Sequence, residues 1–216
     1  MQGPSHLLLS WYFADASALE KPRDRRIVAW SGLAPDVEVL AYAGALVYYR
    51  LDKDLAFENV WQVVHRKYTH GLTFLLLTVV LACLLASPGR RWKVALLACA
   101  AGVLHNFCDL IAGGPTWPIY PFWPVSGLAW SASWSWTIGE WPNLALLALL
   151  LAGMFAYARW AGRSPLECFG SAADGWFVRT VRNERRGAAS PGTRWIIWAA
   201  VVLVCVAILA PLGFRV

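Results

Sequence analysis

The chain has 216 residues, a length that suits one domain and leaves no room for two separate soluble cores of ordinary size. Hydrophobic residues make up 58% of it and charged residues 15%, whereas soluble domains have about 25% charged residues. Together with fourteen tryptophans, which favour the membrane interface, this composition excludes an ordinary soluble protein and indicates a chain surrounded by lipid.

The net charge of +6 does not indicate a nucleic-acid-binding protein. The basic residues form short clusters beside apolar runs, at 21–26, 90–93 and 179–186, which is typical of anchoring to anionic lipid headgroups. No basic-aromatic groove and no helix-turn-helix pattern accompanies them. The five cysteines are odd in number and widely spaced, so we expect neither a disulfide framework nor a thiolate zinc finger.

The amino-terminal region predicts short helices. No basic residue precedes the short apolar stretch 7–13, so a cleavable signal peptide is not expected. Ser5 can cap a helix that begins near His6. The charged segment 21–26 predicts a polar loop, and Pro35 predicts the first turn of another helix, where the helix dipole favours acidic residues.

Four long apolar runs follow, at 72–86, 94–112, 144–158 and 195–214. Only the second and the fourth approach the ~20 residues of a full membrane span. Short polar breaks between the runs predict antiparallel hairpins. The sequence therefore predicts an all-α integral membrane bundle with about four membrane-embedded helices and shorter N-terminal helices. We expect a single domain over 1–216, with a metal-site region at 1–143 and C-terminal membrane helices at 144–216.

A proline-rich aromatic segment lies between the second and third runs. It has four prolines within residues 115–124, which forbids a regular helix. Further tryptophans follow as far as Trp141. We predict a rigid loop at the level of the lipid headgroups that forms one wall of a lipid-facing pocket.

All four histidines lie in the first half of the chain, each near a carboxylate, a hydroxyl or another histidine. Imidazole and carboxylate together are what a divalent metal such as zinc selects. His105 and Asp109 are four residues apart and project from one face of a helix. His65 and His70 are five apart, about 140° on an ideal helix. They can converge if Thr69 caps a helix and leaves His65 in the preceding loop.

Antiparallel threading of the runs places the later candidate ligands on one side of the membrane, namely His65, His70, His105, Asp109 and Glu140. Counting Lys and Arg gives ten on the opposite side and nine on the ligand side, to which the cluster 21–26 is assigned. The positive-inside rule then makes the ligand side non-cytoplasmic, by a margin of one residue.

Most candidate residues also have a purely structural interpretation. Asp109 is the exception, because an ionised group in an apolar run costs ~2.5–3.5 kcal/mol if it faces lipid and therefore needs a partner. Asp36 and Glu38 are either ligands or acids at the start of a helix. His6 is either a ligand or a buried packing residue, and Glu140 is either a ligand or an interfacial acid.

Arg66 and Lys67 lie between the paired histidines and would repel a lone cation. They fit a site that also binds an anion, because a guanidinium pairs with phosphate through two hydrogen bonds. A phosphoester substrate would explain why candidate metal ligands, carboxylates and an arginine occur close together in this sequence.

Three motifs indicate a family resemblance: Gly32-Leu33-Ala34-Pro35-Asp36, His65-Arg66-Lys67-Tyr68-Thr69-His70-Gly71-Leu72, and His105-Asn106-Phe107-Cys108-Asp109-Leu110, which leads into 117–122. From His6 to about Pro124 the sequence resembles the YdjM-like family of LexA-binding, inner-membrane-associated metal-dependent hydrolases. That family is distantly similar in fold to zinc-dependent phospholipase C and the fungal single-strand nucleases. It usually has serine in place of Gly71 and aspartate in place of Glu38.

The resemblance implies divalent-metal ligands at His6, Asp36, His65, His70, His105 and Asp109, to which we add Glu140 from its sequence position. Zinc is the expected metal, with manganese or magnesium as alternatives. The resemblance also implies a metal-bound water as nucleophile, Asp36 or Glu38 as its general base, and Arg66 to stabilise charge on phosphoryl oxygens. The expected partners are membrane lipid and a small-molecule or lipid phosphoester.

Three other classes remain open. Paired histidines in a membrane bundle can bind haem, as in a b-type cytochrome subunit, although the acidic neighbours argue against it. Intramembrane Asp and His also suit an ion or proton transporter, although no inverted repeat is visible. A non-catalytic membrane protein with a structural metal would use nearly the same residues.

Overall fold

The computed structural model describes residues 1–184, and the predicted apolar run at 195–214 lies outside the described residues. Within residues 1–184 the chain is helical apart from short turns and the segment 113–140. Extended pairing in that part is limited to an isolated bridge between Ile119 and Trp130. The all-α prediction is confirmed.

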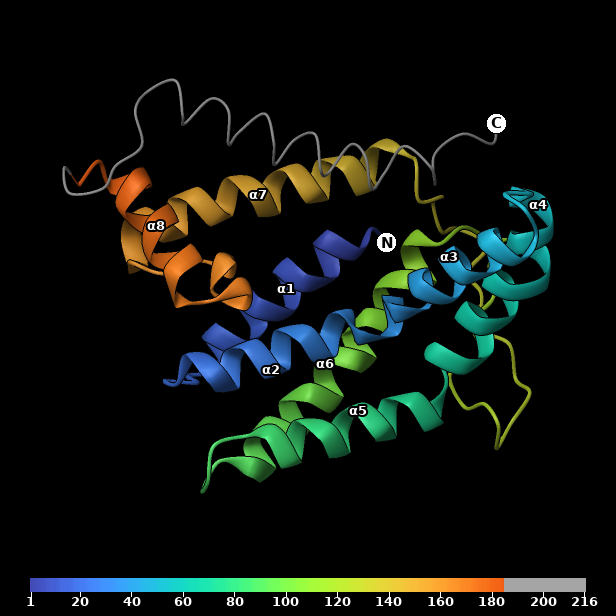
Figure 1. Cartoon of the computed structure of the whole chain (residues 1–216), viewed down its shortest axis with the longest axis horizontal. Coiled ribbons are helices and arrows are strands. Elements are labelled where there is room, and N and C mark those ends of the chain that lie inside the picture. The colour runs from blue at the N-terminus through green and yellow to red at the C-terminus, as the bar shows by residue number, and fades with distance from the viewer. Residues whose placement is uncertain (185–216) are drawn as a thin grey trace.

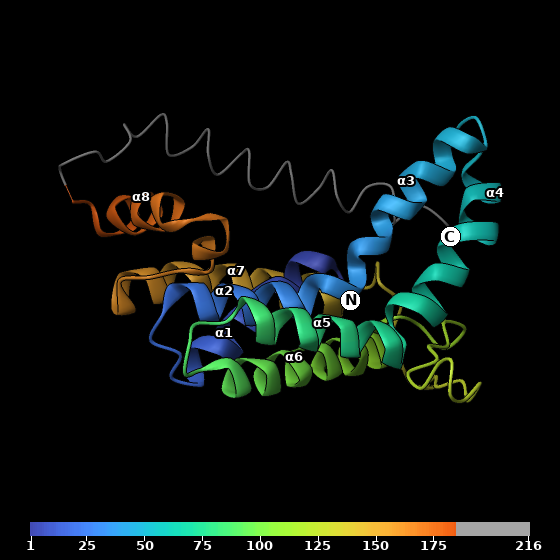
Figure 2. The same cartoon turned by 60° about the horizontal axis from the view of Figure 1, so that its bottom comes forward.

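The elements follow in the order α1 (Gly3–Ala16), α2 (Pro22–Leu33), η1 (Ala34–Glu38), α3 (Val39–Tyr48), α4 (Lys53–Ala56), η2 (Phe57–Trp61), η3 (Val64–Thr69), α5 (Leu72–Leu85), α6 (Arg91–Ala112), α7 (Trp141–Ala161), η4 (Pro165–Phe169) and α8 (Ser171–Arg182). η1 and η4 are 3-10 helices, and η2 and η3 are π-helices. Figure 2 shows α3 and α4 projecting from the bundle as an arm that returns to it through η3.

Two sequence predictions about the amino-terminal helices are wrong. Helix α1 begins at Gly3 with Pro4 in its first turn, and Ser5 does not cap it. The charged segment 21–26 is not a loop, because α2 begins at Pro22. In both helices proline occupies the first turn, where its missing N–H is harmless and its fixed φ suits the helix.

Helix α2 is central and contacts α1, α5 and α6 (Figure 1). Small residues permit this close packing. A Cβ on Gly32 would lie 1.9 Å from the Oγ of Ser10 on α1, so only glycine fits there without a shift. Ala29 on α2 and Ala98 and Ala101 on α6 are fully buried. The helices that hold the candidate ligands are therefore close together.

Two helices of the described part, α6 and α7, are long and apolar enough to cross a membrane. A third span is possible if Lys53–Thr69 and Leu72–Leu85, which meet at a bend of 62°, cross together. Leu96 on α6 and Leu149 on α7 are 71% and 70% exposed, as expected of side chains that face lipid. The prediction of about four membrane-embedded helices thus corresponds to two or three within residues 1–184.

The turn between α1 and α2 packs against the turn between α5 and α6. The Oδ1 of Asp24 accepts a hydrogen bond from the backbone N–H of Ser87 at 2.9 Å, and Arg90 donates to Glu20 at 2.7 Å. These contacts place 21–26 at the end of the bundle occupied by Arg90, which is the opposite of the sequence-based assignment. The reason is that α1 itself crosses the bundle before this segment begins (Figure 1).

A buried ionic network joins α1, α2, α7 and η4 at this end. Arg25 donates to Glu167 through Nε at 3.1 Å and Nη2 at 2.6 Å. Asp15 accepts hydrogen bonds from Arg163 at 2.7 and 3.0 Å and another from the Tyr157 hydroxyl. Burial alone would raise the pKa of Asp15, but the hydrogen bonds from Arg163 and Tyr157 outweigh it and lower that pKa.

Replacing Arg25 with methionine is expected to destabilise the protein by about 3–5 kcal/mol, because a buried carboxylate is left without its partner. Thermal unfolding of the purified protein in detergent measures the loss. The double variant Arg25→Met/Glu167→Met should recover most of the stability, since a packed apolar pair can replace a buried ion pair at little cost. Equal stability of the single variant and the wild type would contradict this role of Arg25.

Candidate metal centre

The π-helix η3 brings His65 and His70 together. Hydrogen bonds in a π-helix join residues five apart, so side chains with that spacing lie on nearly the same face. The two imidazole centroids are 3.9 Å apart. The expected Thr69 cap is wrong, because His65 lies within η3 and α5 begins only after Gly71. The two histidines converge because the helical turn is wider than that of an α-helix.

Four other candidate ligands come from α1, η1 and α6: His6, Asp36, His105 and Asp109. Asp109 is at the centre. Its Oδ1 lies 3.0 Å from the Nε2 of His6. Its Oδ2 lies 3.0 Å from the Nε2 of His70 and 3.4 Å from that of His105. The Nε2 of His65 is 4.0 Å from the same oxygen. The structure therefore brings all four histidines together around one carboxylate.

The outer nitrogens of three histidines are held by other groups. The partners of Nδ1 are the Gly32 carbonyl for His105 at 2.7 Å, the Glu38 carboxylate for His65 at 2.7 Å and the Thr69 hydroxyl for His70 at 3.1 Å. Because a carbonyl only accepts, the Nδ1 of His105 donates, and its Nε2 in the neutral ring presents a lone pair. Metal-binding histidines in proteins are oriented in this way.

Two of the inward-facing nitrogens lie close enough to compete for a single proton. The Nε2 atoms of His70 and His105 are only 3.0 Å apart, and two lone pairs at that distance repel unless a proton or a cation is shared. The Oδ2 of Asp36 is buried without a hydrogen-bond partner, and its Oδ1 is 3.7 Å from the Nε2 of His105. Imidazole nitrogens with carboxylate oxygens are a donor set for zinc or manganese. The residues therefore fit a divalent cation.

The candidate ligands form two sets, His6, Asp36, His105 and Asp109 in one and Asp36, His65 and His70 in the other. Within each set the ligand atoms lie within 4.8 Å of one another. Asp36 belongs to both sets, and a shared carboxylate can bridge two ions, which in two-metal enzymes lie ~3.5–4 Å apart. The arrangement has donors for one ion or for two.

Glu38 supports the cluster from outside. Its Oε1 pairs with His65, and its Oε2 accepts a hydrogen bond from the hydroxyl of Thr69 at 3.3 Å. Burial raises the pKa of Glu38 to about 7, so its ionised form depends on neighbouring positive charge. Both oxygens of Glu38 are engaged, whereas Asp36 has an oxygen without a partner.

The structure does not bring Arg66 or Glu140 into the cluster. The Arg66 guanidinium lies 4.2 Å from the ring centroid of Trp117, which itself lies 5.4 Å from the ring of His65. Arg66 thus contacts Trp117, which in turn contacts His65, and it does not itself belong to the histidine cluster. Glu140 is exposed at the start of α7, where its Oε1 accepts two hydrogen bonds from Thr137 at 3.0 and 3.1 Å. Its position matches the alternative of an interfacial acid.

Sequence reasoning gave no role to Gly32, Asn106 or Met1. The carbonyl of Gly32 orients His105, a role that leaves no trace in the side-chain pattern. The Nδ2 of Asn106 donates to the backbone carbonyl of His70 at 3.0 Å and ties α6 to η3. Its position beside His105 in the third motif was the available signal. The amino group of Met1 forms an ion pair with Asp109.

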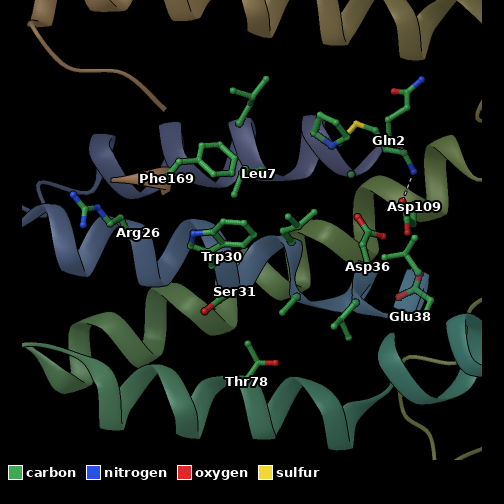
Figure 3. A pocket seen from close by; sticks show the side chains of 18 of the residues that line it. Gln2, Leu7, Arg26, Trp30, Ser31, Asp36, Glu38, Thr78, Asp109 and Phe169 are labelled. Atoms are coloured by element: carbon green, nitrogen blue, oxygen red, sulfur yellow. Dashed lines mark hydrogen bonds and ion pairs between the residues drawn. The ribbon is translucent and has the colours of Figure 1, made fainter. Parts of the chain in front are cut away.

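A cavity of about 1760 Å³ opens onto the cluster. Figure 3 shows Asp36, Glu38 and Asp109 near one end of it and Arg26 near the other. His65 also lines the cavity. Structural zinc sites are closed by protein ligands, whereas catalytic sites keep room for water or substrate. The cluster borders the cavity through His65, Asp36 and Asp109, whereas His6, His70 and His105 are buried behind them.

The fold and the site define a class of protein: an all-helical membrane protein with a buried histidine–carboxylate cluster at one end of a large cavity. Residues 1–213 match the family model described as YdjM inner membrane protein, and the chain belongs to this family. The family resemblance seen in the sequence is confirmed, and the family description supports an inner-membrane location. Comparison with curated proteins and with solved structures gave no match.

Proposed function

We propose that the protein is a membrane-bound, metal-dependent hydrolase of phosphoesters. The observation that supports this most strongly is the set of imidazole Nε2 atoms and carboxylate oxygens that face one another around Asp109 and border a cavity. A structural metal would stabilise the bundle equally well in a closed site. The open cavity favours catalysis.

The residues divide into ligands, a base and an anion-binding group. His6, His65, His70, His105, Asp109 and one oxygen of Asp36 would hold the metal. When bound, a divalent cation supplies Lewis acidity to a phosphoryl oxygen and makes a water easier to deprotonate. Asp36, with its free Oδ2, would accept the water proton. Arg66 would approach the phosphoryl oxygens from its position on Trp117.

Hydrolysis joins the oxygen of water to phosphorus and breaks the bond from phosphorus to the leaving alcohol. One water proton passes to Asp36, and the other stays on the new phosphate oxygen. The leaving alkoxide takes up the proton held by Asp36 and departs as the alcohol, which restores the charge of the site. Glu38 is a positioning residue in this scheme because it holds the Nδ1 of His65.

The candidate site is proposed to face the non-cytoplasmic side of a multi-pass protein. Within the described part, the basic residues at the opposite end are Lys21, Arg23, Arg25, Arg26, Arg90, Arg91, Lys93, Arg159, Arg163, Arg179 and Arg182, and those at the site end are Arg50, Lys53, Arg66 and Lys67. Clusters of Lys and Arg near membrane helices remain in the cytoplasm. The excess of basic residues at the end opposite the site is much larger than the excess of one in the sequence-based count, because 21–26 lies at that opposite end.

Phosphoesterase activity tests the proposal. Purified protein loaded with zinc, manganese or magnesium should hydrolyse bis(p-nitrophenyl) phosphate. Arg66→Gln should lower kcat by about 100-fold or more without loss of metal, as removal of a transition-state donor does. Lys67→Gln is the matched control, because Lys67 lies over the rings of Tyr120 and Trp123 and should keep activity within a few-fold. A metal-loaded protein that hydrolyses no phosphoester would refute the function.

A further inference from the structure

The cavity beside the candidate metal centre has the dimensions of a lipid-binding groove. Its volume of about 1760 Å³ exceeds the roughly 300–1,000 Å³ of ordinary small-molecule pockets. It follows α2, with Leu77 and Leu81 of α5 on one side and Met154 and Phe155 of α7 on the other. A soluble phosphoester would leave most of this space unfilled.

Two hydroxyl side chains along the middle of the groove already have hydrogen-bond partners. The hydroxyl of Ser31 donates to the Ile27 carbonyl at 2.7 Å, and that of Thr78 donates to the Phe74 carbonyl at 2.9 Å. Both hydrogen bonds stay within the helix that bears the hydroxyl. Between the carboxylates at one end and Arg26 at the other, the lining of the groove is therefore predominantly apolar (Figure 3).

The groove extends along α2 away from the carboxylates. Asp36 and Arg26 are ten residues apart along α2 and η1, which corresponds to roughly 15 Å at the helical rise per residue. A phosphoester at Asp36 would allow its alkyl chain to follow α2 towards the end of the groove that bears Arg26.

We infer that the substrate is a membrane lipid phosphoester, whose alkyl chain lies in the groove along α2 while its phosphoryl group meets the cluster at Asp36 and Asp109. The inference rests on the proposed function and adds the substrate class to it. It also assigns roles to Trp30 and Thr78, which line the groove far from the candidate ligands. The groove selects for chain length, whereas the cluster selects for the phosphoester.

Photolabelling of the full-length protein in detergent tests where the alkyl chain lies. The probe is a trace of phosphatidic acid with a diazirine in its acyl chain, and labelled peptides are identified by mass spectrometry. We expect labelling around Trp30 that excess unlabelled phosphatidic acid suppresses at least about tenfold. Thr78→Trp should abolish it by filling the groove. Leu96→Trp, on the outer surface of α6, is the matched control and should leave it unchanged.

A chain-length series provides the kinetic test. Each methylene that is fully buried strengthens binding by about fourfold. In the wild type, kcat/KM should therefore rise at least about tenfold from butanoyl to octanoyl phosphatidic acid. In Thr78→Trp it should not rise, although bis(p-nitrophenyl) phosphate is still hydrolysed.

The outcomes separate the two proposals. Hydrolysis of the soluble ester without labelling at Trp30 would overturn the lipid inference and keep the proposed function. The same conclusion would follow if the groove were filled by residues 185–216 of the chain itself, since Trp30 would again stay unlabelled. Suppressible labelling at Trp30 without hydrolysis of any phosphoester would support lipid in the groove and refute the function.

Discussion

Replacing Asp109 with asparagine is expected to remove divalent metal from the protein. This carboxylate contacts the Nε2 atoms of His6, His70 and His105, and asparagine lacks the negative charge and one of the two acceptor oxygens. The loss of metal affinity should exceed the roughly 10–100-fold that follows loss of an outer partner. Elemental analysis of purified protein after loading with zinc or manganese measures it.

Glu140→Gln is the matched control for this prediction. Both changes neutralise one acid, but Glu140 contacts Thr137 and lies outside the cluster. Its metal content should equal that of the wild type. Glu38→Gln should give an intermediate loss because Glu38 only orients His65. If Asp109→Asn binds as much metal as the wild type, Asp109 does not belong to a metal centre. If Glu140→Gln loses metal, the centre includes Glu140 after all.

Cysteines introduced at the two ends of the bundle are expected to react with a maleimide from opposite sides of the membrane. Val125, in the proline-rich segment near the site, is 81% exposed, and Pro88 is exposed in the turn between α5 and α6. In a background without the native cysteines, Val125→Cys should react with a membrane-impermeant maleimide in intact spheroplasts. Pro88→Cys should react only after the membrane is opened. The difference should be nearly all-or-none, because the maleimide does not cross lipid.

The reverse pattern of labelling would place the candidate site in the cytoplasm and contradict the charge-based orientation. Labelling of both positions in intact spheroplasts would show that the two ends are not separated by a membrane. Neither variant removes a basic residue, so neither alters the charge distribution on which the orientation depends. Detergent gel filtration of both variants checks that they are folded before the labelling is compared.

The helices were predicted well where apolar content alone determines them. The run 94–112 corresponds to α6 at Arg91–Ala112, because a backbone surrounded by lipid must satisfy its own hydrogen bonds as a helix. Prediction failed at 21–26, where charge suggested a loop. That segment begins α2, since Pro22 fits the first turn and Asp24 is bonded to the turn at Ser87. Such long-range partners are not visible in local sequence.

The candidate site was predicted in part. The four-residue spacing of His105 and Asp109 placed both on one helical face, and in the structure they lie within 3.4 Å. The spacing of His65 and His70 was misinterpreted because it assumed α-helical geometry, whereas η3 is a π-helix. The position of Glu140 on the same side did not bring it to the cluster, because Thr137 holds its carboxylate at the start of α7.

The sequence by itself determined that the protein is surrounded by lipid, that it is helical, that it resembles a known family, and which residue types form the candidate centre. These properties follow from composition and from spacing along the chain. Only the tertiary structure decided that His6 and Asp109 meet, that Gly32 and Glu38 orient the imidazoles, and that 21–26 lies at the far end. The physical reason is that such contacts depend on how closely α1, α2 and α6 pack, which the small residues permit but no local pattern specifies.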